Sequence, residues 1–140
     1  MESFLTEDII HPSLSREDEM QRGMDLTRTL LLWIDSDPQL DGTRQIEPDN
    51  PSDIGVINHS YSEVAYNLNL LIDKGYIKGT HGMQMRRISH LTWEGHDFLD
   101  SIRDPETWAK TKKAATRAGG FTVDLLRDLA KGLIKKQIED

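Results

Sequence analysis

The sequence predicts a mostly α-helical protein of the α+β class, with a winged-helix-like core, a small β-hairpin as its wing and three C-terminal helices. Apolar residues recur every three or four positions in several segments, which is typical of amphipathic helices. Short β-branched and glycine-bounded runs between them indicate a small sheet. The length of 140 residues suits one domain. We expect an N-terminal arm over residues 1–22, the core over 23–104 and a helical extension packed on it over 105–140.

One strong helix is expected in the N-terminal part, over residues 24–35, where apolar side chains form a stripe. It ends at Asp37, because the residue before Pro38 disfavours helical geometry. Residues 1–22 mix apolar and charged side chains without a sustained period, and are interpreted as an arm. Residues 38–53 contain three prolines and several aspartates, which predict a long polar loop.

The core continues with a β-branched run at residues 54–58, interpreted as a strand at the edge of the sheet. Ser60 and Glu63 have the spacing of a capping box, in which hydroxyl and carboxylate each accept a backbone N–H of the first turn. A helix is therefore expected over residues 61–74, and Gly75 supplies its left-handed stop.

A hairpin is expected directly after this helix. Residues 76–78 and 85–91 are interpreted as two strands joined by a short turn around Gly79 and Gly82. A helix, a tight glycine stop and a two-stranded ribbon form the back half of a winged helix. The helix then occupies the recognition position, and the hairpin is the wing.

Three helices are predicted after the hairpin, each with its own start signal. Thr92 caps the first, and Asp104 with Pro105 starts the second, since proline fits the first helical position. After a double-glycine break at residues 119–120, Thr122 caps the third. This last helix carries an apolar stripe, with lysines toward its negative end.

Four stretches of the chain resemble a family of small uncharacterised proteins, a domain of unknown function frequent in bacteria, phages and prophages. They are RGMDLTRTLLLWI, YSEVAYNLNLLIDKGYIKG, RRISHLTWEGHDFLDSIRDPETWAKTK and GGFTVDLLRDLAKGLIKKQI, and together they cover residues 22–138. The most specific piece is LTWEGHDFLDSIRD followed by TWAKTK. The resemblance implies a winged-helix-like fold and a mobile-element setting, and brings no catalytic residues. This chain departs from the family in about 21 extra leading residues and a long acidic loop over 39–53.

The formal net charge of -7 is unevenly distributed. Residues 1–53 contain 13 acids and 4 bases, whereas residues 54–140 contain 11 acids and 13 bases. An acidic front suits a basic protein partner, or mimics nucleic acid better than it binds it. The simpler interpretation of such an asymmetry is solvated surface.

Several classes of protein are disfavoured by what the sequence lacks. It has no cysteine, which excludes disulfides and thiolate zinc sites and fits a reducing compartment. No apolar run reaches the roughly 18 residues that span a bilayer, and MESFLTEDII lacks the blocks of a signal peptide. We therefore expect no membrane attachment and a location in the cytoplasm of a bacterial host cell.

No catalytic, cofactor or metal site is expected. The five histidines lack the spacing, with a glutamate, of a helical zinc site. Asp97 and Asp100 share one helix face, but paired carboxylates need a cleft that shifts their pKa values before they act as acid and base. The sequence indicates no such cleft, so we expect a protein that is not an enzyme.

Candidate contact residues lie on two helices and the hairpin. In the recognition-position helix, Asn67 and Asn69 are suited to adenine and Lys74 to phosphate. Arg86 and Arg87 in the hairpin are placed to reach a minor groove or a phosphate backbone. The helix after Asp104 adds basic side chains for phosphate or an acidic protein surface. These are Lys110, Lys112, Lys113 and Arg117. For the hairpin arginines and for this helix alike, solvated surface is the simpler alternative.

Three hypotheses follow. The first is a winged-helix interaction protein of phage type that binds a host or phage protein, such as a defence or replication factor. The second is a winged-helix DNA-binding transcriptional regulator. Glu63 and Asp73 face outward on a helix with only one lysine, which favours the first. The third is a self-associating scaffold that pairs its closing helix through Leu126 and Leu133, and the sequence leaves the oligomeric state open.

Overall fold

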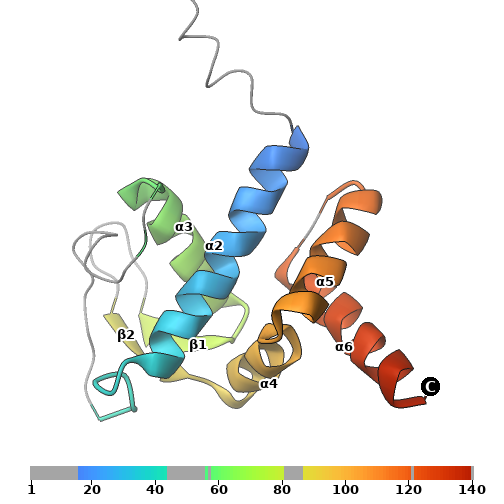
Figure 1. The fold of residues 1–140 in the computed structure, drawn as a ribbon. Helices are drawn as coiled ribbons and strands as arrows, with labels where there is room; N and C mark the ends of the chain where they lie inside the picture. Colours follow the sequence, from blue (N-terminus) through green and yellow to red (C-terminus); the bar gives the residue numbers. More distant parts are fainter. Residues whose placement is uncertain (1–15, 44–55, 57, 81–86, 121, 140) are drawn as a thin grey trace, which may run out of the picture.

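The computed structural model describes residues 16–43, 56, 58–80, 87–120 and 122–139. Within these residues the chain forms five helices and one two-stranded antiparallel sheet (Figure 1). The mostly helical α+β class predicted from the sequence is confirmed. In chain order, the elements are α2 (Arg16–Ser36), α3 (Tyr61–Asp73), β1 (Ile77–Thr80), β2 (Arg87–Leu91), α4 (Trp93–Ile102), α5 (Pro105–Arg117) and α6 (Val123–Glu139).

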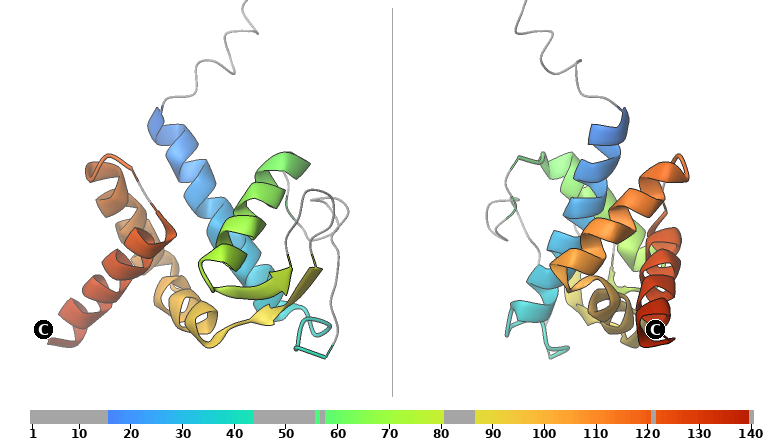
Figure 2. Two further views of the ribbon diagram at one scale, coloured as in Figure 1. Left: turned by 180° about the vertical axis from the view of Figure 1, so that it is seen from behind. Right: turned by 45° about the vertical axis from the view of Figure 1, so that its right-hand side comes forward.

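Helix α2 is the central element of the described structure. It contacts α3, β2, α4 and α5, whereas α6 packs on α4 and α5. In Figures 1 and 2, α3 and the hairpin lie on one side of α2 and α5 lies on the other. Every helix and both strands contribute side chains to one apolar cluster, in which Met24, Leu30 and Leu31 of α2 are fully buried. Burial against α2 therefore organises both halves of the chain.

Helix α2 begins at Arg16, earlier than the start near Met24 that the apolar stripe predicts. Its first turn contains Glu17, Asp18 and Glu19, whose negative charges are stabilising at the positive end of the helix dipole. The first turn contains polar side chains only, so the spacing of apolar residues could not indicate a helix there. The part of the predicted arm from residue 16 to 22 is thus helical, and residues 1–15 lie outside the described residues.

Helix α3 and its ends are as predicted. Ser60 is the N-cap and forms a complete capping box with Glu63, and Lys74 is the C-cap. Gly75 follows in the left-handed region, with φ of 83°. The Tyr76 N–H then donates to the carbonyl of Leu71 at 2.9 Å, which closes the helix end.

The predicted hairpin is confirmed, with shifted strand bounds. β1 pairs antiparallel with β2, Ile77 opposite Leu91, and the register slips by a bulge next to Gly79. A Cβ on Gly79 would lie 2.4 Å from the carbonyl oxygen of Arg87, so the close approach of the two strands requires glycine here. The predicted turn at Gly82 lies outside the described residues.

The strand predicted over residues 54–58 is not found at either of its described positions. Val56 is buried but belongs to no strand. Asn58 has a φ of 66°, which is left-handed rather than extended, and its carbonyl accepts a 2.7 Å hydrogen bond from Arg22. At Val56 and Asn58, the β-branched composition of this run therefore did not produce a strand. The other residues of the run lie outside the described part of the chain.

The three predicted C-terminal helices are confirmed, together with their caps. The Thr92 hydroxyl accepts from Gly95, the Asp104 carboxylate from Thr107, and the Thr122 hydroxyl from the N–H of Leu125. Arg28 of α2 donates to the last carbonyls of α4, those of Ile102 at 2.9 Å and Arg103 at 2.7 Å. The corner between α4 and α5 is thereby fixed to α2.

Candidate functional site

A groove of about 780 Å³ lies between the first halves of α2 and α3. We call it the α2–α3 groove. It brings together charged, aromatic and amide side chains from two elements that residues 37–60 separate in sequence. Its lining residues are Glu19, Arg22, Gly23, Leu26, Asn58, His59, Ser62, Glu63, Tyr66 and Asn67.

The capping box of α3 orients the central carboxylate of this groove. Glu63 Oε1 accepts the N–H of Ser60 at 2.8 Å, while Ser60 Oγ accepts the N–H of Glu63 at 3.1 Å. The other oxygen, Oε2, lies 3.6 Å from Arg22 Nη2 and 3.7 Å from His59 Nδ1. One acidic side chain thus serves both as helix cap and as groove wall.

Glu63 is ionised at neutral pH. Its pKa is lowered chiefly by the hydrogen bond from the Ser60 backbone, with burial opposing and the charges of His59 and Arg22 adding to the effect. The Nδ1 atom of His59 is buried and has no hydrogen-bond partner among the described residues. The Glu63 carboxylate and the His59 imidazole therefore lie side by side in the wall of the groove.

Two tyrosines are exposed on α3. Tyr66 lines the groove and is 68% exposed, and Tyr61 is 43% exposed. Tyrosine is enriched at protein interfaces, because its ring gives contact area at low entropic cost and its hydroxyl remains satisfied in water. The groove therefore offers an aromatic surface beside the carboxylates of Glu19 and Glu63.

Asn67, predicted to face outward, lies against α2 instead. Its Oδ1 is 3.2 Å from the Thr27 hydroxyl, which donates to it, and its Nδ2 donates to the Glu63 carbonyl at 3.0 Å. The cause is its position three residues after the buried Val64, which puts it at the edge of the inner helix face. Its amide is engaged within the chain by these two hydrogen bonds, so it is not a free base-reading group.

The other predicted residues of α3 and the hairpin are dispersed. Asn69 is half-buried, and Lys74 is exposed but pairs with Asp124 at 3.4 Å. Arg87 is exposed at the start of β2, and both Arg87 and Asn69 interact with other residues of the chain. Arg86 lies outside the described residues.

The four predicted cations of α5 differ in their surroundings. Lys112 contacts Asp25 at 2.9 Å and lies 5.6 Å from the ring centroid of Trp108, and Lys110 lies 3.8 Å from the carboxylate of its neighbour on the helix, Glu106. Lys113 and Arg117 are exposed. Because α5 and the hairpin lie on opposite sides of α2, the described basic residues do not form one strip (Figure 2).

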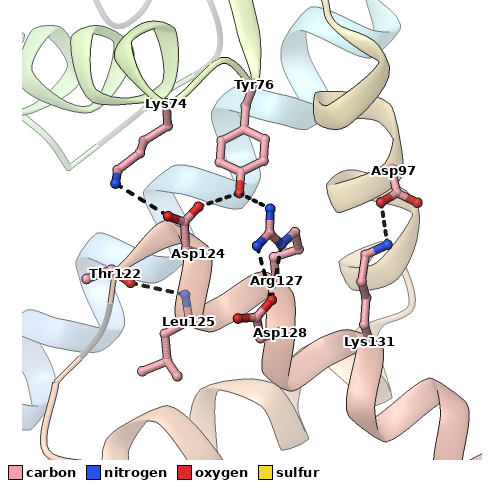
Figure 3. Close-up of polar contacts among 9 residues, drawn as sticks. All are labelled: Lys74, Tyr76, Asp97, Thr122, Asp124, Leu125, Arg127, Asp128 and Lys131. Atoms are coloured by element: carbon pink, nitrogen blue, oxygen red, sulfur yellow. Dashed lines mark hydrogen bonds and ion pairs between the residues drawn. The ribbon is translucent and has the colours of Figure 1, made fainter.

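A polar cluster joins α6 to the end of α3 and to Tyr76 (Figure 3). Tyr76 donates to Asp124 at 2.6 Å, and Arg127 donates to the Tyr76 hydroxyl at 3.0 Å. Burial, and then the hydrogen bond to Asp124, raise the pKa of Tyr76, while that same bond lowers the pKa of Asp124. Tyr76 is thus held neutral and acts as a hydrogen-bond donor. No local sequence signal pairs residues this far apart, so the cluster was not predicted from the sequence.

A smaller hollow, of about 320 Å³, lies between the end of α2 and the start of α4 and contains His90 and His96 with three aspartates. Of these, Asp35 is 3.2 Å from Arg103 and 3.7 Å from His96. In the described part of the chain, no group of three or more His, Cys, Asp or Glu side chains is placed to hold a metal ion. The hollow is therefore interpreted as a polar contact between helices.

Comparison with known proteins places the chain in a family. The family described as hypothetical protein (DUF2513) matches residues 21–121. This chain belongs to the DUF2513 family. An uncharacterized protein of Haemophilus influenzae is similar to it, with 27% identity over 124 residues that cover 85% of this chain and 99% of the relative. No solved structure gives a significant match.

The DUF2513 match confirms the predicted resemblance to a small uncharacterised family, over a shorter stretch than residues 22–138. It includes most of the α2–α3 groove, the hairpin, α4 and α5, and it ends before α6 begins at Val123. The described helices include none that is long and apolar enough to cross a membrane.

Proposed function

We propose that this DUF2513 protein is a non-catalytic, winged-helix-like interaction protein of phage or prophage type. It binds a host or phage protein, such as a defence or replication factor, in the bacterial cytoplasm. The contact surface is the α2–α3 groove, and its ligand is a basic segment of the partner. The placement of α3 directly before a two-stranded ribbon supports the winged-helix comparison.

The composition of the α2–α3 groove carries this proposal. Glu19 and Glu63 place two carboxylates on its walls, and the cation Arg22 is already engaged by Glu63 and the Asn58 carbonyl. An incoming arginine or lysine finds carboxylates for charge-assisted hydrogen bonds and the exposed Tyr66 ring for a cation–π contact.

The wider charge distribution supports the same partner. Residues 1–53 contain 13 acids against 4 bases, and the N-terminal half of α2 forms one wall of the groove. A negative field of this extent raises the association rate with a basic surface and repels a phosphate backbone. On α3, Asn67 and Lys74 are both engaged by other parts of the chain.

A DNA-binding regulator remains the second candidate, because Lys113 and Arg117 are exposed on α5 and Arg87 is exposed on β2. In this alternative, α5 touches phosphate and the groove has no role. The two candidates therefore predict opposite responses to changes in the groove and in α5.

Site-specific photo-crosslinking in bacterial cells tests the main proposal. A photoreactive phenylalanine analogue replaces Tyr66 in the groove and, in a matched control, Lys113 on the far side of α2. We expect a discrete crosslinked protein from position 66 that is absent from position 113, with the crosslink in a segment rich in lysine and arginine. Crosslinks from both positions to the same proteins would contradict a groove-specific partner.

A charge reversal with a close control makes the test quantitative. Glu19→Lys changes the groove, whereas Glu17→Lys makes the same change of charge two residues earlier, on the side of α2 that faces α5. We expect Glu19→Lys to weaken binding of the crosslinked partner about tenfold or more, and Glu17→Lys to leave it nearly unchanged. Equal losses of affinity in the two variants would mean that the partner responds to the overall charge of α2 and does not bind in the groove.

Duplex DNA at low salt tests the alternative. Tight binding with a steep salt dependence, lost in Lys113→Glu with Arg117→Glu and retained in Glu19→Lys, would replace the main proposal with the regulator. We expect no such binding.

A further inference from the structure

The apolar stripe of α6 continues beyond the side chains that cover it. Val123, Leu126 and Ala130 in the first half are buried. Leu133 and Ile134 are only half-buried, and Ile138 is 79% exposed. The end of α6 extends away from the body of the protein in Figures 1 and 2. An amphipathic helix is stabilised by burial of its whole stripe, so its last two turns lack an apolar cover within the described chain.

This uncovered part of α6 forms one side of a groove of about 580 Å³ against α4. We call it the α4–α6 groove. It has an acidic wall on α4, a basic wall on α6 and apolar side chains between them. Its lining residues are Asp97, Asp100, Ser101, Lys131, Ile134, Lys135 and Ile138. Trp93, four residues before Asp97 and hence on the same helix face, is 83% exposed.

The charges in this groove are partly paired within the chain. Lys131 of α6 contacts Asp97 of α4, which ties the two walls together (Figure 3). Asp100, one turn further along α4, contacts Arg103 at 3.2 Å and keeps 70% of its side chain exposed. Lys135 is exposed one turn beyond Lys131. The outer rim of the groove therefore presents Asp100 on one side and Lys135 on the other.

We propose that a second copy of this chain occupies the α4–α6 groove and forms a symmetric dimer. In a two-fold interface the same surface lies on both copies, so the surface must complement itself. The α4–α6 groove meets this condition, because a two-fold axis along it puts the acidic wall of one copy opposite the basic wall of the other. Ile134 and Ile138 of both copies then cover each other.

The same charge arrangement disfavours the other occupants. DNA would meet Asp97 and Asp100, and the basic partner segment proposed for the α2–α3 groove would meet Lys131 and Lys135. The DUF2513 match ends at residue 121, before α6. The proposed dimer thus combines α4, inside the matched region, with α6, outside it. It also differs from pairing through Leu126, which is fully buried within one copy.

Sedimentation velocity of the full chain tests the dimer at concentrations from about 1 μM to about 1 mM. We expect the mass to rise from that of the 16.0 kDa chain to twice that value. Ile138→Asp changes a side chain that is 79% exposed, so the fold is retained while the dimer is weakened about tenfold or more. Tyr66→Asp makes a similar change on the exposed α2–α3 groove and leaves the dimer intact.

Charge reversal then tests the symmetry of the interface. Asp100→Lys and Lys135→Asp each weaken the dimer, whereas a mixture of the two single variants restores it, since every cross-dimer pair again joins opposite charges. A wild-type mass of one chain at the highest concentration overturns the proposal. Loss of the dimer in Tyr66→Asp but not in Ile138→Asp also overturns it, and assigns self-association to the α2–α3 groove.

Discussion

The Tyr76 hydroxyl donates a 2.6 Å hydrogen bond to Asp124, and so links the start of the hairpin to the first turn of α6, 48 residues later. Arg127 donates to the same hydroxyl at 3.0 Å. The Tyr76 ring itself is buried, with its centroid 5.1 Å from that of Phe98. Tyr76 is thus a core residue whose polar end positions the closing helix.

Replacement of this tyrosine by phenylalanine measures that link. Tyr76→Phe keeps the ring and removes the hydroxyl, so it loses the hydrogen bonds to Asp124 and Arg127. We expect the free energy of unfolding to fall by about 2 kcal/mol, because both partners are charged. Urea denaturation followed by circular dichroism gives this value. Tyr66→Phe, at an exposed ring, serves as the control and is expected to change it by less than about 0.5 kcal/mol.

Alkaline pH is expected to weaken the same link. The folded protein raises the pKa of Tyr76 above its ordinary value of 10.0. The protonated hydroxyl therefore stabilises the fold fully below pH 10.0, and this contribution is lost as the pH rises toward the folded-state pKa. The stability difference between wild type and Tyr76→Phe, measured by urea denaturation from about pH 8 to about pH 11, should shrink above about pH 10. A difference that stays constant would contradict the raised pKa.

Gly95 permits a close approach of α4 to the backbone of Tyr76, the residue before β1. A Cβ at this position would lie 2.0 Å from the Tyr76 carbonyl oxygen, a backbone atom that also accepts the N–H of Thr92 at 3.1 Å. Gly95→Ala is therefore expected to destabilise the protein by about 3 kcal/mol, since the backbone must move. Gly132→Ala is the matched change on α6, where a Cβ meets nothing within 4 Å. It should stabilise by roughly 0.5–1 kcal/mol, because alanine favours helix. Thermal denaturation of both variants checks the opposite signs.

Asp25 joins α2 to α5 through two donors. Its Oδ1 accepts from Trp108 Nε1 at 2.9 Å and from Lys112 Nζ at 2.9 Å. Asp25→Ala leaves the indole N–H of the buried Trp108 without this acceptor, and we expect a loss of about 1–3 kcal/mol together with a shift in tryptophan emission. Glu17→Ala, at an exposed acid in the first turn of the same helix, should leave the tryptophan emission unchanged and lower the free energy of unfolding by less than about 1 kcal/mol, the size of a first-turn charge effect. An unchanged emission in Asp25→Ala would contradict the contact.

Sequence alone predicted the elements that local signals define. The capping box at Ser60, the stop at Gly75 and the restart at Asp104 each depend on residues within four positions of one another, and the structure places all three as predicted. The start of α2 was missed, because acids in a first turn are compatible with an arm as well as with a helix.

The candidate site required information that the sequence does not carry. The α2–α3 groove joins residues from α2 with residues of the segment 58–67, and the inward turn of Asn67 depends on Thr27, 40 residues earlier. Helical spacing alone places Asn67 at the border between the inner and outer faces, so the presence of α2 decides its direction. Asn67 was therefore assigned to the outer surface, and the exposed Tyr66 was overlooked.

The hydrogen bonds from Arg28 to the Ile102 and Arg103 carbonyls make the corner between α4 and α5 depend on a contact that spans 74 and 75 residues of the chain. A contact of this sequence separation needs both halves of the chain, so a fragment that ends before Ile102 lacks the acceptors for Arg28.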